Sequence, residues 1–138
     1  MIKRLLVAYD GSRQAEKAFT FALDVAGKYA AGLIVLAVAR PPEPPVAVET
    51  EAVIDHATRY YQEKFDGLQQ RAAEAGVESK FEIRVGHPAE QIVLLADEAG
   101  VDLIVMGHRG ESFFQRWLLG SVAKRVLSYA RCAVTVVR

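Results

Sequence analysis

The hydrophobic positions of the chain follow two alternating patterns. Five short segments are apolar at nearly every position, or at every second position, as β-strands are. They cover residues 2–9, 33–39, 80–85, 103–106 and 133–137. Between them lie four longer segments in which apolar residues recur every three or four positions, a spacing typical of amphipathic helices. The chain is therefore predicted to fold in the order βαβαβαβαβ.

Capping residues delimit the predicted helices. Ser12 is a good N-cap for the first helix, and Pro88 suits the first position of the third. The second helix covers residues 50–75, and Gly76 and Gly100 end the second and third helices. Each predicted helix has one apolar face. That of the first helix is Ala15, Phe19, Ala22, Ala26 and Tyr29, and that of the second is Val53, Ala57, Tyr61, Phe65, Leu68, Ala72 and Ala75. That of the third is Ile92, Leu95, Ala96 and Ala99, and that of the last is Leu119, Val122, Val126 and Ala130.

The connections between the strands predict the fold class. Each is longer than a dozen residues, so neighbouring strands are expected to be parallel and joined by helical crossovers. The fold class is thus α/β, a doubly wound five-stranded parallel sheet with helices on both faces. Phe81, Ile83 and Val85 are expected on the buried side of a strand whose other side, with Glu82 and Arg84, faces water, a pattern typical of a sheet edge. Ligands of such sheets bind beyond the carboxyl ends of the strands.

Length, charge and cysteine content narrow the classes of function. A chain of 138 residues is expected to form one domain, residues 1–138. Lysine plus arginine and aspartate plus glutamate both number 17, and this balance argues against nucleic acid as the main partner. No apolar run suggests a signal peptide or a membrane span. Cys132 is the single cysteine, which favours a reducing compartment. We therefore expect a cytoplasmic protein without membrane contact.

One loop carries the candidate chemistry. It follows the strand at 103–106 and reads Gly107-x2-Gly110-x9-Gly120-Ser121, where the last helix begins. Glycine lets a backbone approach a ligand closely, and a helix start offers unpaired N–H groups and partial positive charge to a phosphate. An ordinary loop with turn glycines and a serine cap explains the same residues without any ligand.

This loop resembles the nucleotide-binding signature G-x2-G-x9-G-[S/T] of the universal stress protein family. The resemblance extends from Tyr9-Asp10-Gly11-Ser12, at the end of the first strand, to the apolar segment Ala133–Val137. It implies a Rossmann-like fold, similar to the adenine nucleotide alpha hydrolases, with strand order 3-2-1-4-5. It also implies bound ATP, or ADP or AMP, with magnesium or manganese. The family's dimer contacts imply a homodimer through Ala133–Val137 and an output read by an unknown protein partner.

The resemblance also implies roles for individual residues. The backbones of Gly107, Gly110 and Gly120 and the hydroxyl of Ser121 would face the phosphates. Asp10 would lie beside the nucleoside or the metal, which Ser121 would also bind. The remaining predicted nucleotide contacts are Arg109, preferred over His108 for the phosphates, an apolar adenine wall of Ala8, Val38 and Met106, and Val122.

Each of these residues also has a purely structural interpretation. Asp10 can simply shape the turn before the first helix, and Ser121 can simply cap the last one. Ala8, Val38 and Met106 are equally suited to the core. Lys124 and Arg125, in or near the first turn of the last helix, would oppose the helix dipole unless a polyphosphate is bound, and each alone suits a solvated surface.

The loop at 111–118 departs from the family pattern because it contains Phe113, Phe114 and Trp117. These rings suggest a lid over the nucleotide or a partner surface. The sequence shows no P-loop, kinase motif set or Ser-His-Asp spacing, so at most weak ATP hydrolysis is expected. Two alternatives stay open: a slow ATPase or other nucleotide-using enzyme on the same fold, and a structural dimer that binds no nucleotide.

Overall fold

The computed structural model describes residues 1–44, 47–109 and 118–138, and it describes the side chains of all of them except 47 and 48. Five parallel strands form one sheet in the order β3-β2-β1-β4-β5, which confirms the predicted fold class and strand order. The elements, in chain order, are β1 (Arg4–Ala8), α1 (Arg13–Tyr29), β2 (Gly32–Ala39), α2 (Ala47–Glu74), β3 (Ser79–Val85), α3 (Pro88–Ala99), β4 (Leu103–Gly107), α4 (Ser121–Tyr129) and β5 (Ala133–Val137).

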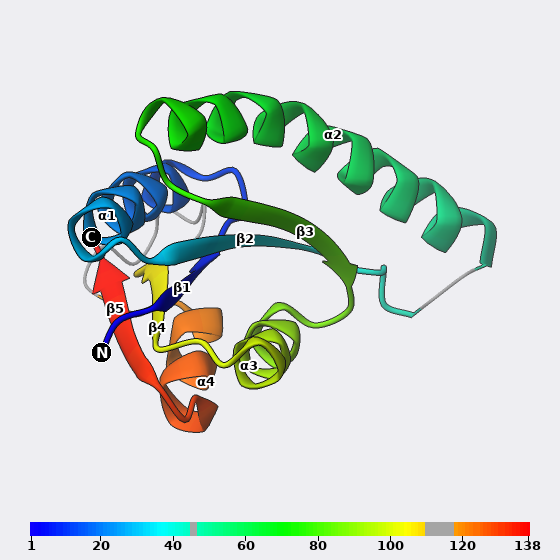
Figure 1. Ribbon diagram of the computed structural model, residues 1–138. Coiled ribbons are helices and arrows are strands. Elements are labelled where there is room, and N and C mark those ends of the chain that lie inside the picture. The colour runs from blue at the N-terminus through cyan, green and yellow to red at the C-terminus, as the bar shows by residue number, and fades with distance from the viewer. Residues whose placement is uncertain (45–46, 110–117) are drawn as a thin grey trace.

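Helices cover both faces of the sheet, with α1 and α2 on one side and α3 and α4 on the other (Figure 1). Successive side chains of a strand point to opposite faces, so each central strand contributes to two cores. Leu5 and Val7 of β1 join the core under α1 and α2, while Leu6 joins the core under α3 and α4. This two-sided burial is why β1, β2 and β4 are apolar at consecutive positions.

Helix α1 begins as predicted. The Ser12 side-chain oxygen accepts a hydrogen bond from the Ala15 N–H at 3.1 Å, and Ala15, Phe19, Ala22 and Ala26 are buried. The prediction that Tyr29 belongs to this buried face is wrong, because its side chain is 58% exposed. The helix ends at Tyr29, and Ala31 in the return to β2 fills the core at that end instead.

Helix α2 extends beyond the sheet that it covers. Its 28 residues span about 42 Å, whereas the seven residues of β3 span only about 23 Å. Phe65 and Leu68 are buried as predicted, but Val53 is exposed, because the amino-terminal part of α2 projects past the end of β3 (Figure 1). Ala75, also predicted to be buried, lies just beyond the helix end and is exposed.

The two edges of the sheet are β3 and β5. The edge position of β3 is confirmed, and Phe81 and Ile83 pack against the core under α1 and α2. The predicted burial of Val85 is wrong, because it ends the strand and is exposed. On the opposite side of β3, the Arg84 guanidinium binds Glu82 and also Glu98 of α3, so that side is bridged to a helix rather than left to water.

Helix α3 starts at Pro88 and ends at Gly100, which adopts a left-handed conformation, as predicted. Its predicted face is confirmed at Ile92, Leu95 and Ala96, which are buried. In helix α4 the most buried residues are Val126, as predicted, and Ala123, which the spacing analysis missed. Within the described ranges, no helix is both long and apolar enough to cross a membrane. The cytoplasmic location stays a prediction.

We expect Phe65→Ala to lower the free energy of unfolding by about 3–5 kcal/mol. The Phe65 ring is 5% exposed and packs against the rings of Tyr9, Tyr61 and Phe81. The matched control is Phe21→Ala, because Phe21 is 41% exposed on α1, and its loss should be below about 1 kcal/mol. Urea unfolding of both variants measures the difference, and equal losses would contradict the assigned core.

Candidate functional site

A pocket of about 870 Å³ lies at the carboxyl ends of the strands, where the winding of the sheet reverses between β1 and β4. Its volume is in the range of pockets that hold small molecules and cofactors. It brings together nine of the ten residues predicted to contact a nucleotide. These nine are Ala8, Asp10, Val38, Met106, Gly107, Arg109, Gly120, Ser121 and Val122. The tenth, Gly110, lies outside the described residues, as do Phe113, Phe114 and Trp117.

The two described loop glycines are required by the packing of the chain itself. A Cβ on Gly107 would lie 2.7 Å from the Gln14 Cβ of α1, closer than real atoms approach. A Cβ on Gly120 would lie 3.0 Å from the Arg109 Cα. The Gly120 N–H also donates to the His108 carbonyl at 2.7 Å. The predicted phosphate donor at Gly120 is therefore occupied, and this amide holds the two ends of the loop together.

The open donors lie one residue further on. Gly120, not Ser121, is the N-cap of α4, and the first helical hydrogen bond runs from the Lys124 N–H to the Gly120 carbonyl. The N–H groups of Ser121, Val122 and Ala123 therefore have no partner within the helix. All three residues line the pocket, and the positive end of the helix dipole favours an anion there. Lys124 and Arg125 are exposed and lie outside the pocket lining.

Asp10 lies both in the turn before α1 and in the pocket lining, and its contact with a nucleoside or metal stays a prediction. Its Oδ1 accepts a hydrogen bond from the Ser12 N–H at 2.9 Å, which shapes the turn before α1. Its Oδ2 makes no hydrogen bond within the described residues, and the exposed carboxylate lines the pocket. Magnesium is commonly held by one or two carboxylates together with substrate phosphates, and Asp10 fits that role. Among the described residues, no group of three or more His, Cys, Asp or Glu side chains forms a metal site by itself.

Helix α2 contributes a wall of the pocket that sequence patterns did not predict. Tyr60 and Tyr61 line it, and their rings pack edge to face with centroids 5.3 Å apart. Gly11 has a φ of +83°, and a Cβ on it would overlap the Tyr60 hydroxyl, so the turn after β1 lies directly against α2. Arg40, just after β2, also lines the pocket. No local signal reveals these residues, because their position depends on how α2 and β2 pack in the whole fold.

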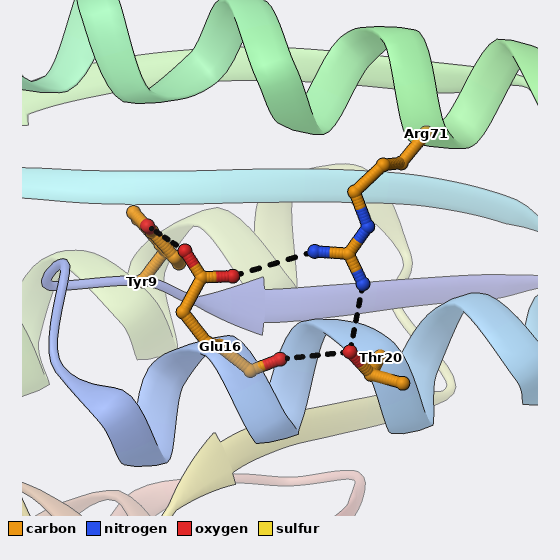
Figure 2. Close-up of polar contacts among 4 residues, drawn as sticks. All are labelled: Tyr9, Glu16, Thr20 and Arg71. Carbon is orange, nitrogen blue, oxygen red and sulfur yellow. Dashed lines mark hydrogen bonds and ion pairs between the residues drawn. The ribbon is translucent and has the colours of Figure 1, made fainter.

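A polar network fixes α2 against α1 beside the pocket. Figure 2 shows Glu16 between Tyr9 and Arg71: the Tyr9 hydroxyl donates to Glu16 Oε1 at 2.7 Å, and Arg71 Nη1 lies 3.4 Å from Glu16 Oε2. Arg71 Nη2 also donates to Thr20 Oγ1 at 2.8 Å, and the guanidinium lies over the Phe19 ring. Burial first, and the bond to Glu16 second, raise the pKa of Tyr9 well above that of a free tyrosine.

His108 does not reach the pocket. It is 8% exposed and lies outside the pocket lining, whereas Arg109 is part of that lining. Its backbone N–H donates to the Val137 carbonyl of β5 at 2.9 Å. Neither ring nitrogen has a hydrogen-bond partner in the part of the chain that the structure describes. The preference for Arg109 over His108 as a phosphate contact agrees with this placement, and the contact itself stays a prediction.

Comparison with known proteins gives one consistent result. The model of the Universal stress protein family matches residues 1–138. The universal stress protein YxiE of Bacillus subtilis is 34% identical, and the match covers 100% of both chains. The universal stress protein UspA of Lactobacillus plantarum is a similar solved structure, with a TM-score of 0.91, 28% identity and coverage of 99% of this chain and 98% of that one. A universal stress protein solved in complex with cAMP has a TM-score of 0.69 and 26% identity over 99% and 97% of the two chains.

We expect Tyr9→Phe to lower the free energy of unfolding by about 1–2 kcal/mol near neutral pH, because Glu16 loses a hydrogen-bond donor. The folded chain holds the Tyr9 proton more tightly than the unfolded chain does. This contribution is therefore complete below about pH 10 and is lost as the pH rises above it. Urea unfolding at about pH 7 and about pH 10.5 should show that the variant loses less stability than the parent over this interval. The same sensitivity in both proteins would contradict the assignment, and Tyr29→Phe, at an exposed tyrosine, is the control.

Proposed function

The chain belongs to the universal stress protein family, and on that basis we propose that it is an ATP-binding signalling module of the stress response. The observation that carries this proposal is the convergence of the predicted contacts on one pocket. They come from segments far apart in the sequence, the ends of β1, β2 and β4 and the start of α4. Only the folded chain brings them together.

The phosphates would bind at the start of α4. The N–H groups of Ser121, Val122 and Ala123 have no partner within the helix and lie at the positive end of its dipole. The Ser121 hydroxyl adds a fourth donor. Arg109 would supply a permanent positive charge beside them. A carboxylate near a polyphosphate repels it, so the open oxygen of Asp10 favours a magnesium or manganese ion between the two, or a contact with ribose hydroxyls.

The base would bind against the apolar part of the pocket. Ala8, Val38 and Met106 line it next to one another, from the neighbouring strands β1, β2 and β4. An apolar wall with few polar groups is the usual environment of a planar ring. The related protein solved with cAMP supports an adenine nucleotide here. We propose ATP, with ADP or AMP as weaker ligands, because the G-x2-G-x9-G-S signature is the family's ATP-binding pattern, and because the start of α4 and Arg109 provide donors and positive charge for more than one phosphate.

The output of the module would be conformational. Among the described residues, Asp10 is the one carboxylate in the pocket lining, so we expect hydrolysis to be slow and the bound state of the nucleotide to be the signal. Nucleotide binding would bias the loop or the dimer, and another protein would detect that change. Within the described residues, strand β5 pairs with β4 on one side only, and its other edge is the surface that we propose for the homodimer.

We expect the gently purified protein to release ATP on denaturation, detected by mass spectrometry. Calorimetric titration should show that Ser121→Ala weakens MgATP binding by about 5-fold or more, because a hydrogen bond to phosphate is lost. Ser121→Pro should weaken it further, because proline also removes the N–H. Proline suits this first helical position, and Gly120 before it is extended with ψ 157°.

The matched control is Ser128→Ala, because the Ser128 hydroxyl bonds to the Lys124 carbonyl on the exposed side of the same helix. This variant should bind MgATP like the parent. Equal unfolding midpoints would show that all three variants fold. Absence of nucleotide from the purified parent, together with no titration signal from added MgATP, would refute the proposed function.

We expect the protein to sediment as a dimer of two 15.2 kDa chains. The Val137 carbonyl accepts a bond from the His108 N–H on the β4 side, so strand alternation turns the N–H of Val136 toward the open edge. Val136→Pro should therefore weaken the dimer without breaking the β4–β5 pairing. Sedimentation velocity over a range of concentrations measures the shift to monomer, with circular dichroism as the test of folding. A parent that is monomeric throughout would contradict the proposed dimer.

A further inference from the structure

The pocket has two halves of different chemistry. The half formed by the end of β4 and the start of α4 contains the amides at the start of that helix, the Ser121 hydroxyl and the side chain of Arg109. The half formed by β2 and α2 is lined by Val38, Tyr60 and Tyr61, with Arg40 at its rim. Among the described residues that line this second half, Arg40 is the charged one, beside the hydroxyls of Tyr60 and Tyr61. A few placed polar groups in an apolar wall usually set the orientation and the identity of a ligand.

Arg40 makes no hydrogen bond or ion pair in the part of the chain that the structure describes. Glu43, three residues further along the chain, lies 3.8 Å from His87 Nε2. Glu82 and Glu98 at the same edge of the sheet are both bound to Arg84. The guanidinium of Arg40 is therefore exposed at the pocket with all of its donors available.

The sheet places Arg40 away from the phosphate end. Strand β1 lies between β2 and β4, so the ends of β2 and β4 are separated by two strand spacings, roughly 10 Å. A nucleotide whose phosphates bind at the start of α4 reaches the end of β2 with its nucleoside part. Arg40 therefore lies nearer to the nucleoside end of such a ligand than to its polyphosphate.

We propose that Arg40 is a specificity-determining residue that donates hydrogen bonds to acceptor atoms on the edge of a purine base. This inference rests on the proposed function. A guanidinium has five N–H donors and no acceptor. Every purine offers N7 as an acceptor, guanine adds O6 beside it, and adenine carries an amino donor there instead. Arg40 thus favours purine nucleotides, and it contributes more to the binding of a 6-oxopurine than to that of adenine.

The test compares three ligands on matched variants by calorimetric titration with magnesium: ATP, GTP and inorganic tripolyphosphate. Arg40→Ala should weaken ATP binding by about 5-fold and GTP binding by more, up to about 100-fold for a bidentate contact. Tripolyphosphate binding should change by less than about 2-fold, because that ligand has no base. Arg59→Ala removes the same charge from an exposed position of α2 outside the pocket lining and should change none of the three. Arg40→Lys should recover little of the GTP affinity, because lysine lacks the planar fork.

Three results would overturn the inference. Unchanged ATP and GTP binding by Arg40→Ala would show that Arg40 touches no ligand. A loss of tripolyphosphate affinity as large as the loss of nucleotide affinity would place Arg40 at the phosphates. A larger loss of affinity for ATP than for GTP would contradict contact between Arg40 and the acceptor edge of the base. Failure of the parent protein to bind either nucleotide would refute the proposed function and this inference with it, whereas the first three results concern the Arg40 variant and leave ATP binding by the parent protein unaffected.

Discussion

The structure depends on the burial of a parallel sheet on both faces. Parallel strands need long crossovers, and the helices of those crossovers can shield both faces only if the winding reverses once. The reversal lies between β1 and β4, with α1 and α2 on one face and α3 and α4 on the other. The chain leaves β1 and β4 toward opposite faces of the sheet. The segments that follow these two strands therefore diverge and leave a crevice between the strand ends. The pocket, the open start of α4 and the turn at Asp10 all follow from this constraint.

The pocket walls are held by different interactions on the two faces. At the end of β4, close backbone packing sets the wall: Gly107 lies tightly against Gln14 of α1, and the hydrogen bond from the Gly120 N–H to the His108 carbonyl holds the loop ends together. Beside α2, aromatic packing around Phe65 and the network of Tyr9, Glu16 and Arg71 position the helix (Figure 2). The first wall depends on the absence of side chains and the second on large ones. Substitutions should therefore destabilise the two walls for opposite reasons. A larger residue at a glycine of the first wall would overlap its neighbours, and a smaller residue in the second wall would lose packing contacts.

Local signals predicted the elements well, because Ser12 and Gly100 cap their helices, Pro88 occupies a first helical position and the central strands are apolar throughout. The strand order came from the family resemblance, since periodicity carries no information about it. The errors at Tyr29, Val53 and Val85 occur where an element ends or passes the edge of the sheet, and helical or strand spacing does not show where its partner stops. Tyr60 and Arg40 were missed for a related reason: only the packing of α2 and the end of β2 brings them to the pocket.

The contact between Gly11 and Tyr60 has a mechanical consequence. Helix α2 is anchored near its carboxyl end by Arg71, touches the pocket turn at Tyr60 and projects past the sheet to its first residue, Ala47 (Figure 1). Tyr60 lies about 16 Å along the helix from Arg71, and Ala47 lies about 36 Å from it. If the helix pivots as a rigid rod about its anchor, a displacement at the turn is roughly doubled at the projecting end. Because Phe65 and Leu68 also hold the carboxyl-terminal half of α2, such a tilt would move mainly the end that projects past the sheet.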